Sequence, residues 1–272
     1  MSKENILDRI MNRKAEEVSK RRRQVSEGEL LKTANTIDAT RGFAQSLIDQ
    51  VNTKTPAVIA EIKRASPSKG LIIPNQDNFH PAKIAKEYQQ NGATCISCLT
   101  DKDFFSGDDK FIQQIRNEIN LPVLRKDFIF DPYQVVEARA IGADAILLIM
   151  AVLSLAQAQE LEAAANELGL DVLVEVHNEE ELEYAHDLKT PLMGVNNRNL
   201  KTFQTSLDVT MRLATMTEAN RIVVSESGIN NTDDIKNLRK NNIHAYLIGT
   251  AFMKFENPGV ELGKLIKEFF IK

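Results

Sequence analysis

The stretch PVLRKDFIFDPYQVVEARAIGADAILLIM, residues 122–150, decides the fold. It starts with a short apolar run, passes through Asp131 and Pro132 into a segment with helical spacing of its apolar residues, and reaches Gly142 before a second apolar run. Aspartate and proline are typical of a helix start, and glycine is typical of a helix end. The stretch therefore predicts a strand, a helix and a second strand that lies parallel to the first.

The same alternation repeats from about residue 56 to the end of the chain. Further helix starts are indicated at Ser154 and Asn178, and a further helix end at Gly169. Nearly continuous apolar character in short strands is typical of parallel strands that are covered on both faces. Eight units predict an α/β fold, a (β/α)8 TIM barrel, although a doubly wound open sheet has similar units. The predicted strands are residues 57–62, 94–99, 122–127, 145–150, 171–176, 192–197, 221–226 and 245–250.

A helical extension precedes the first predicted strand. We predict one domain over residues 1–272, with the extension at 1–55 and the barrel at 56–272. Helical segments are indicated around Ile6, Leu7 and Ile10 and at 28–31 and 43–51, and the last helix spans 259–270. The extension either caps the bottom of the barrel or folds over its mouth. Because the chain ends after the eighth unit, we expect a monofunctional protein.

Charge and hydropathy restrict the partners. The net charge of -4 and the pI of about 5.7 argue against binding to nucleic acid or to an acidic membrane. The start MSKENILDRI has no signal-peptide hydrophobic region, and no apolar run is long enough to span a membrane, so we expect a cytoplasmic protein. The basic cluster of residues 20–23 with Lys14 is interpreted as a solvated helix face.

The two cysteines form a CxxC pair within the predicted second strand. Residues three apart in a strand point to opposite faces, so Cys95 and Cys98 cannot hold a metal ion together there. We interpret both as small buried hydrophobic residues and predict no metal site.

Charged and amide side chains stand at the carboxyl ends of several predicted strands, where reactive residues lie in a parallel barrel. Glu61 and Lys63 share one face of the first strand. For these two residues taken alone, a structural ion pair and a catalytic role are equally good explanations. Charged side chains in a core are costly unless they are paired or functional, and the repetition favours function. The other members of this group are Lys126, Glu175, Asn196, Arg198 and Glu226. Such a mixture suits acid–base chemistry on an anion.

Two further groups point to the kind of ligand. Ser227 and Gly228 after the seventh strand, and Gly249 and Thr250 after the eighth, predict a phosphate site, although the glycines could be turn residues. Nucleotide-binding glycine fingerprints are absent from the sequence. Phe105 and Phe128 follow the second and third strands and could enclose a flat ring, whereas Phe130 better suits core packing.

Seven motifs occur in an order that resembles the indole-3-glycerol-phosphate synthase family over nearly the whole chain. The strings AEIKRASPSKG (60–70) and LRKDFIFDPYQ (124–134) are the specific ones. The others are LTDKDFFSGD (99–108), LVEVHNEEEL (173–182), GVNNRNLKTF (194–203), VSESGI (224–229) and LIGTAFM (247–253).

The resemblance implies a carboxy-lyase of tryptophan biosynthesis that needs no cofactor and acts on an anthranilate-sugar phosphate. It implies that Lys126 is the general acid of ring closure, that Glu175 is the general base, and that Lys63 contacts an anionic group and serves as a second acid. Glu61 and Asn196 would orient substrate hydroxyls. Substrate contacts are implied for Ser66, Phe105, Phe128, Arg198, Glu226 and Ser227, and phosphate contacts for Gly228, Gly249 and Thr250. The partner is then the small-molecule substrate, and we expect a monomer or a weak homodimer.

Two positions depart from the family pattern, and two other functions compete. Thr250 stands where serine is commoner, and Asn199 replaces an aspartate, so an ion pair of that aspartate is in doubt. A phosphoribosylanthranilate isomerase would share the phosphate site but would place a cysteine on the first strand. A catalytically silent phosphate-binding barrel is the second alternative, and the ring of charged residues argues against it.

Overall fold

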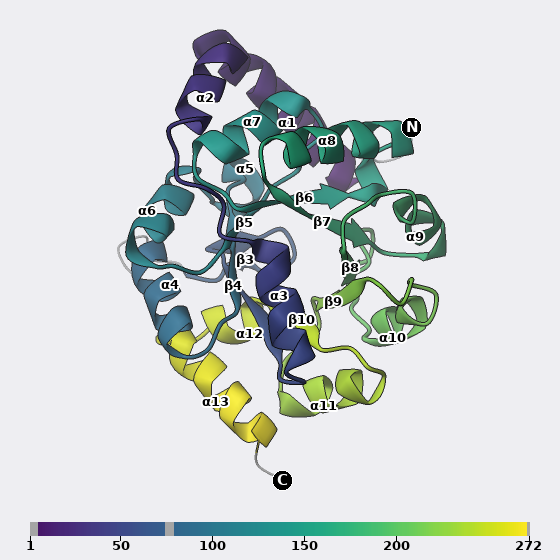
Figure 1. The fold of residues 1–272 in the computed structure, drawn as a ribbon. Coiled ribbons are helices and arrows are strands. Elements are labelled where there is room, and N and C mark those ends of the chain that lie inside the picture. The colour runs from purple at the N-terminus through teal and green to yellow at the C-terminus, as the bar shows by residue number, and fades with distance from the viewer. Residues whose placement is uncertain (1–4, 74–78, 271–272) are drawn as a thin grey trace.

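Eight parallel strands close into a barrel in the computed structural model, which describes residues 5–73 and 79–270 (Figure 1). The closed order β1-β10-β9-β8-β7-β6-β5-β4 confirms the predicted barrel, and the open-sheet alternative is wrong. The eight predicted strands are all present, and the observed bounds differ from the predicted ones by at most two residues at either end. They are β1 Ala57–Ile62, β4 Cys95–Leu99, β5 Val123–Lys126, β6 Ala145–Ile149, β7 Asp171–Val176, β8 Leu192–Asn196, β9 Ile222–Glu226 and β10 Ala245–Ile248.

A small antiparallel hairpin, which the sequence did not predict, lies in the loop after β1. Its strands are β2 (Ala65–Ser66) and β3 (Gly70–Leu71), with Ser66 paired to Gly70. Both strands have only two residues, which is too short for an alternating pattern to be recognised. The hairpin gives the predicted substrate contact Ser66 a defined backbone.

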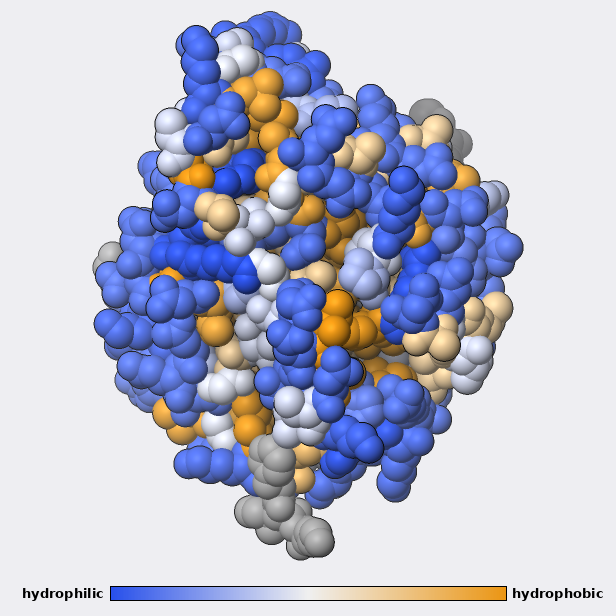
Figure 2. All heavy atoms as spheres, in the orientation of Figure 1, coloured by the Kyte–Doolittle hydropathy of each residue, from blue (hydrophilic) through white to orange (hydrophobic). Residues whose placement is uncertain are grey.

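Helices surround the barrel, and hydrophilic residues cover most of the face that Figure 2 presents, with hydrophobic residues visible in the gaps. The predicted helix starts are confirmed, because the side chains of Asp131, Ser154 and Asn178 accept hydrogen bonds from backbone N–H groups of the helices that follow. Gly142 and Gly169 lie just after helix ends with positive φ. The helices of the barrel part are α4 Pro81–Gln90, α5 Lys102–Phe105, α6 Lys110–Glu118, α7 Pro132–Ala140, α8 Leu155–Glu167, α9 Glu179–Ala185, α10 Asp208–Ala214, α11 Thr232–Lys240, α12 Thr250–Met253 and α13 Pro258–Phe270, with the 3-10 helix η2 at Met150–Val152.

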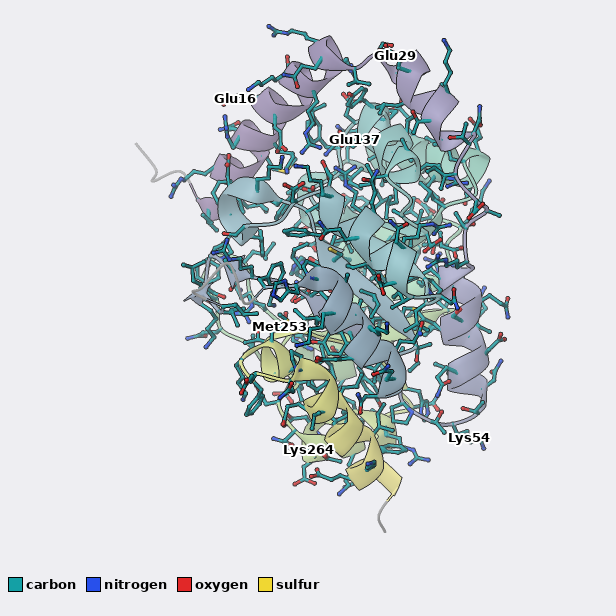
Figure 3. All side chains as sticks on the ribbon, turned by 90° about the vertical axis from the view of Figure 1, so that its left-hand side faces the viewer. Glu16, Glu29, Lys54, Glu137, Met253 and Lys264 are labelled. Atoms are coloured by element: carbon teal, nitrogen blue, oxygen red, sulfur yellow. The ribbon has the colours of Figure 1, made fainter. Side chains whose placement is uncertain are left out.

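The N-terminal extension covers the bottom of the barrel and also reaches its mouth, the two alternatives that the sequence left open. It forms α1 (Ile6–Gln24), α2 (Glu27–Ala34) and α3 (Phe43–Asn52). Figure 3 shows α1, which carries Glu16, and α3, which ends near Lys54, on opposite sides of the barrel. Phe43 and Leu47 of α3 are fully buried against the interior residues at the amino ends of the strands. The extension therefore closes the bottom with α3 and reaches the mouth with α1.

The prediction that Lys14 and the nearby basic residues form a solvated face is wrong for Lys14 and Arg21. Lys14 is 3% exposed, and its Nζ lies 2.9 Å from carboxylate oxygens of both Asp101 and Asp127. Arg21 pairs with Asp109, and also with Glu137, which Figure 3 places beneath the N-terminal helices. The acidic partners come from loops after β4 and β5 and from α7, so the sequence of α1 alone could not reveal them.

The apolar core has two layers, one inside the barrel and one between the barrel and its helices. Cys95 belongs to the inner layer and Cys98 to the outer one, which confirms that the two thiols point to opposite faces. Burial raises the pKa of both thiols. Phe130 packs against the outer layer, as predicted. Among the described residues no group of His, Cys, Asp and Glu side chains is arranged to hold a metal ion. No helix in residues 5–73 and 79–270 combines the length and apolar character needed to cross a membrane.

Candidate active site

A pocket of about 430 Å³ opens at the carboxyl ends of the barrel strands. This volume lies within the range of sites for drug-sized ligands. The structure brings every predicted site residue to its wall. These residues are Glu61, Lys63, Ser66, Phe105, Lys126, Phe128, Glu175, Asn196, Arg198, Glu226, Ser227, Gly228, Gly249 and Thr250. Their location is observed, and their chemical roles stay predictions.

Lys126 lies at the centre of the charged group, at the end of β5. Its Nζ is 2.8 Å from a carboxylate oxygen of Glu226 and 3.3 Å from one of Glu175. The shorter of these two contacts is therefore the one to Glu226. The three side chains come from β5, β7 and β9, so closure of the barrel is what brings them together.

The ionisation of these groups follows from burial and from their contacts. Burial alone would lower the pKa of Lys126, but Glu226 and Glu175 outweigh it and raise that pKa. Burial would raise the pKa of Glu175, but Lys126 and His177 outweigh it and hold that pKa well below its usual range. Burial raises the pKa of Glu226 to about 7, with Lys126 opposing the rise. Lys126 is therefore a cation, Glu175 is a carboxylate, and Glu226 titrates near neutral pH.

Glu61 and Lys63 form the ion pair that their spacing suggested, with 2.6 Å between Nζ and Oε1. Gly249 at the end of β10 makes room for this pair, because a Cβ atom there would overlap Oε1 of Glu61. In the same way, a Cβ atom at Gly194 of β8 would overlap Oε1 of Glu226. The two glycines thus permit two acidic side chains to turn into the barrel mouth.

The ends of β8 and β9 are fixed by Asn197, a residue that the sequence did not single out. Its side-chain Nδ2 donates to Oγ of Ser225 and to the backbone oxygens of Glu226 and Ser227, and its Oδ1 accepts from Thr210. Asn197 is 2% exposed. An asparagine next to a predicted site residue was the only available signal, and it could not be told from Asn196.

The loop after β8 joins the hairpin across the mouth. Arg198 Nη1 donates to Oγ of Ser68 at 3.2 Å. Asn199 stands where the family that the sequence resembles has an aspartate. Its side-chain oxygen accepts hydrogen bonds from the backbone N–H groups of Lys201 and Thr202. Asn199 therefore caps its own loop.

One side of the pocket suits a phosphate group. Ser227 and Gly228 follow each other with φ values of 62° and 84°, a backbone shape that only glycine adopts freely. Lys254 lines the same pocket as these residues.

The other side of the pocket is apolar. The rings of Phe105 and Phe128 are tilted toward each other with centroids 6.2 Å apart. Ile6, Leu7 and Ile10 of α1 line the same pocket. The sequence indicated a helix with these three residues on one face, but it gave no sign of which surface they would contact.

The sequence of the chain matches one known protein family over most of its length. The model of a protein family described as indole-3-glycerol phosphate synthase matches residues 7–265. The chain belongs to this family. A curated indole-3-glycerol phosphate synthase from Magnetococcus marinus is 56% identical over 262 residues, which cover 96% of this chain and 98% of that protein. The resemblance predicted from the seven motifs is confirmed, and the chain is an enzyme of tryptophan biosynthesis.

Solved structures with low sequence identity share the fold. Tryptophan synthase subunit alpha from Legionella pneumophila is 12% identical with a TM-score of 0.61, and the match covers 85% of this chain and 99% of that one. Thiamine phosphate pyrophosphorylase from Pyrococcus furiosus is 17% identical with a TM-score of 0.56, over 81% of this chain and 99% of that one. At these identities the likeness concerns the barrel alone.

Proposed function

We propose that this member of the indole-3-glycerol phosphate synthase family converts 1-(2-carboxyphenylamino)-1-deoxyribulose 5-phosphate into indole-3-glycerol phosphate, carbon dioxide and water. In class it is then a carboxy-lyase. The observation that carries the proposal is Lys126, a cation with a side chain only 15% exposed, which two acidic side chains hold in a pocket lined by both polar and apolar residues.

The pocket offers a place for each part of the substrate. The phosphate group suits the side formed by Ser227, Gly228, Gly249 and Thr250, and the flat anthranilate ring suits the apolar wall of Phe105, Phe128 and α1. The sugar chain then crosses the charged centre. Glu61 and Asn196 are available there to accept hydrogen bonds from its hydroxyl groups.

Ring closure needs a proton at the ketone oxygen. The ring carbon that carries the carboxylate attacks the ketone carbon, and the electrons of the C=O bond move to oxygen. Lys126 donates its proton to that oxygen, because an alkoxide is a stronger base than a lysine amine. The raised pKa of Lys126 ensures that the proton is present when the substrate arrives.

Decarboxylation and dehydration complete the reaction. The electron pair of the bond to the carboxylate returns to the ring as carbon dioxide leaves, and aromaticity is restored. Glu175 then takes a proton from the new five-membered ring while the hydroxyl group leaves as water with a proton from Lys63. One proton from solvent restores the charges, and no step requires a cofactor.

Indole fluorescence is a direct test, because the chain has no Trp and only 4 Tyr. Purified protein mixed with the substrate should show a rise in indole fluorescence and the release of one carbon dioxide per indole. Phosphoribosylanthranilate serves as the competing substrate. Turnover of that compound alone would replace the proposal by the isomerase, and turnover of neither would favour the silent barrel.

The isomerase alternative has no observation in its favour. Its cysteine would lie on the first strand, whereas β1 carries Glu61 and both cysteines lie on β4, buried in the core.

The remaining expectations are proposals of the same kind. We propose that the enzyme acts in the cytoplasm as a monomer or a weak homodimer, with the small-molecule substrate as its partner and without nucleic acid or membrane. Sedimentation of the purified protein at several concentrations would test the oligomeric state. A stable tetramer or larger assembly would contradict it.

A further inference from the structure

His177 stands directly behind the proposed base. It follows β7, two residues after Glu175, and its side chain is 9% exposed. Residues two apart at a strand end share a face, so both side chains turn toward the same side of the barrel. No part of the mechanism above uses His177.

The imidazole of His177 lies between two carboxylates. Its Nδ1 is 2.9 Å from Oε2 of Glu181, at the start of α9, and its Nε2 is 3.3 Å from Oε1 of Glu175. The second contact is an ion pair rather than a well-directed hydrogen bond. Glu181 is itself held in place, because it accepts hydrogen bonds from the backbone N–H of His177 and from Nδ2 of Asn178.

Glu175 therefore has a separate neighbour on each of its oxygens. Oε1 faces His177, whereas Oε2 faces Lys126 at 3.3 Å. Lys126 is closer to Glu226, at 2.8 Å, so Glu175 shares that cation with a second acid. A cation at His177 is shared as well, with Glu181, but it lies at the oxygen of Glu175 that Lys126 does not contact.

We infer that His177 is a positioning residue that, clamped by Glu181, holds Glu175 in place as an oriented carboxylate through the later steps of the reaction. The inference rests on the proposed function and adds two residues to it, His177 and Glu181. Neither of them lines the pocket, so both act through Glu175.

The need for such a residue arises when Lys126 gives up its proton. Glu175, which is 3% exposed, then loses the cation at its Oε2, and burial favours its protonated form. A protonated Glu175 cannot accept the proton that dehydration releases. The imidazolium at Oε1 does not take part in the first proton transfer, so it keeps Glu175 ionised for the second.

The surroundings of His177 favour its charged form. Burial lowers the pKa of the imidazole, but Glu175 and Glu181 outweigh this and raise the pKa to about 10. Among the residues that the structure describes, Glu175 and Glu181 are the ionisable groups paired with the ring. The 3-10 helix η2 has the sequence Met-Ala-Val, β8 contributes the amide of Asn196, and Arg212 of α10 pairs with Glu179.

Two variants and one matched control test the inference. His177→Gln keeps a hydrogen-bond donor for Glu175 but removes the charge, and Glu181→Gln keeps the shape of the clamp but removes its negative charge. His186→Gln changes a histidine at the end of α9 that does not line the pocket. For each protein, kcat and KM for the substrate are measured by indole fluorescence from pH 5 to pH 9, and thermal unfolding reports whether the variant is folded.

We expect His177→Gln to lower kcat about tenfold or more, a part of the 10²- to 10⁴-fold that a positioned base contributes, with KM within about twofold of the wild type. The acidic limb of kcat should move up by about one pH unit or more, because Glu175 takes up a proton more easily once Lys126 has given up its own. Glu181→Gln should show the same changes to a smaller extent, and His186→Gln should show neither. A purely structural role would change stability without moving the pH profile.

A direct view of the imidazole gives a readout that does not depend on activity. In the NMR spectrum of the free enzyme, with the four histidines assigned through single variants, His177 should stay protonated above pH 8. Titration near its usual pKa of 6.5 would overturn the inference. So would a folded His177→Gln protein with the kcat and pH profile of the wild type.

If His177→Gln does not fold, Glu181→Gln decides the question by the same profile. Absence of turnover by the wild type contradicts the proposed function instead, so the two failures are distinguishable.

Discussion

The buried contacts of Lys14 lead to the prediction that Lys14→Met destabilises the protein strongly. Methionine fills a similar volume but leaves Asp101 and Asp127, both 2% exposed, without the cation that lies 2.9 Å from each. Removal of one partner from a buried ion pair costs about 3–5 kcal/mol, because the remaining charge is left uncompensated. Arg125, whose Nη2 is 3.7 Å from Asp127, offsets only a part of this.

The size of the effect can be expressed as a shift in thermal midpoint. Unfolding entropy is about 2.1 cal/mol/K per residue, so 272 residues give about 0.57 kcal/mol per degree, and the loss of 3–5 kcal/mol corresponds to roughly 5–9 °C. Lys20→Met, at an exposed position of the same helix, is the matched control and should shift the midpoint by less than about 1 °C.

Lys14→Met should also lower kcat, since Asp127 follows Lys126 directly and α1 forms one wall of the pocket. Differential scanning calorimetry gives the midpoint and indole fluorescence gives kcat. If Lys14→Met were as stable and as active as Lys20→Met, the argument that this buried ion pair anchors α1 at the mouth would be refuted.

Three further predictions concern Glu226, Gly249 and the cysteines. The pKa of Glu226 is about 7 in the folded protein against a usual 4.5, so its contribution to stability is complete below pH 4.5 and is lost as the pH rises to 7. In urea unfolding, the wild type should therefore lose stability relative to Glu226→Gln between pH 4.5 and pH 7. A difference in stability that stays constant over this range would contradict the raised pKa. Gly249→Ala should lower kcat/KM roughly 10²-fold, because the new methyl group displaces Glu61. The control Gly28→Ala, whose methyl group meets no atom within 4 Å, should keep full activity. Equal activities of the two variants would show that the reaction does not depend on the position of Glu61. Cys95 and Cys98 should react with a thiol reagent only after unfolding, because both are fully buried with raised pKa values, and fast labelling of the native protein would disprove that placement.

The barrel and the ring of charged residues could be predicted because both depend on local order along the chain. Each strand is marked by an apolar run, and the rule that reactive residues follow strand ends is enough to predict Lys126, Glu175 and Glu226 at one mouth. What this rule leaves open is which of these side chains face each other. The short contact between Lys126 and Glu226 joins β5 to β9 across the barrel, and only its closure fixes that distance.

The parts that could not be predicted depend on where one surface meets another. The apolar face of α1 was visible at Ile6 and Ile10, but its direction relative to the barrel was not. Lys14 looked like one more basic residue on a solvated helix, because its acidic partners lie far away in the sequence. His177 lies within one of the seven motifs but had no predicted role, since a histidine after a strand gains meaning only from the carboxylates on its two nitrogens.

The most direct test of the account is the rate of indole formation at saturating substrate by the wild type and by Lys126→Ala, with Lys102→Ala as the control at an exposed position of α5. The account predicts indole formation by the wild type and by Lys102→Ala, and a loss of 10²- to 10⁴-fold, an order-of-magnitude range, in a folded Lys126→Ala protein. A folded Lys126→Ala protein that formed indole at more than about half the wild-type rate would contradict the assignment of Lys126 as the general acid.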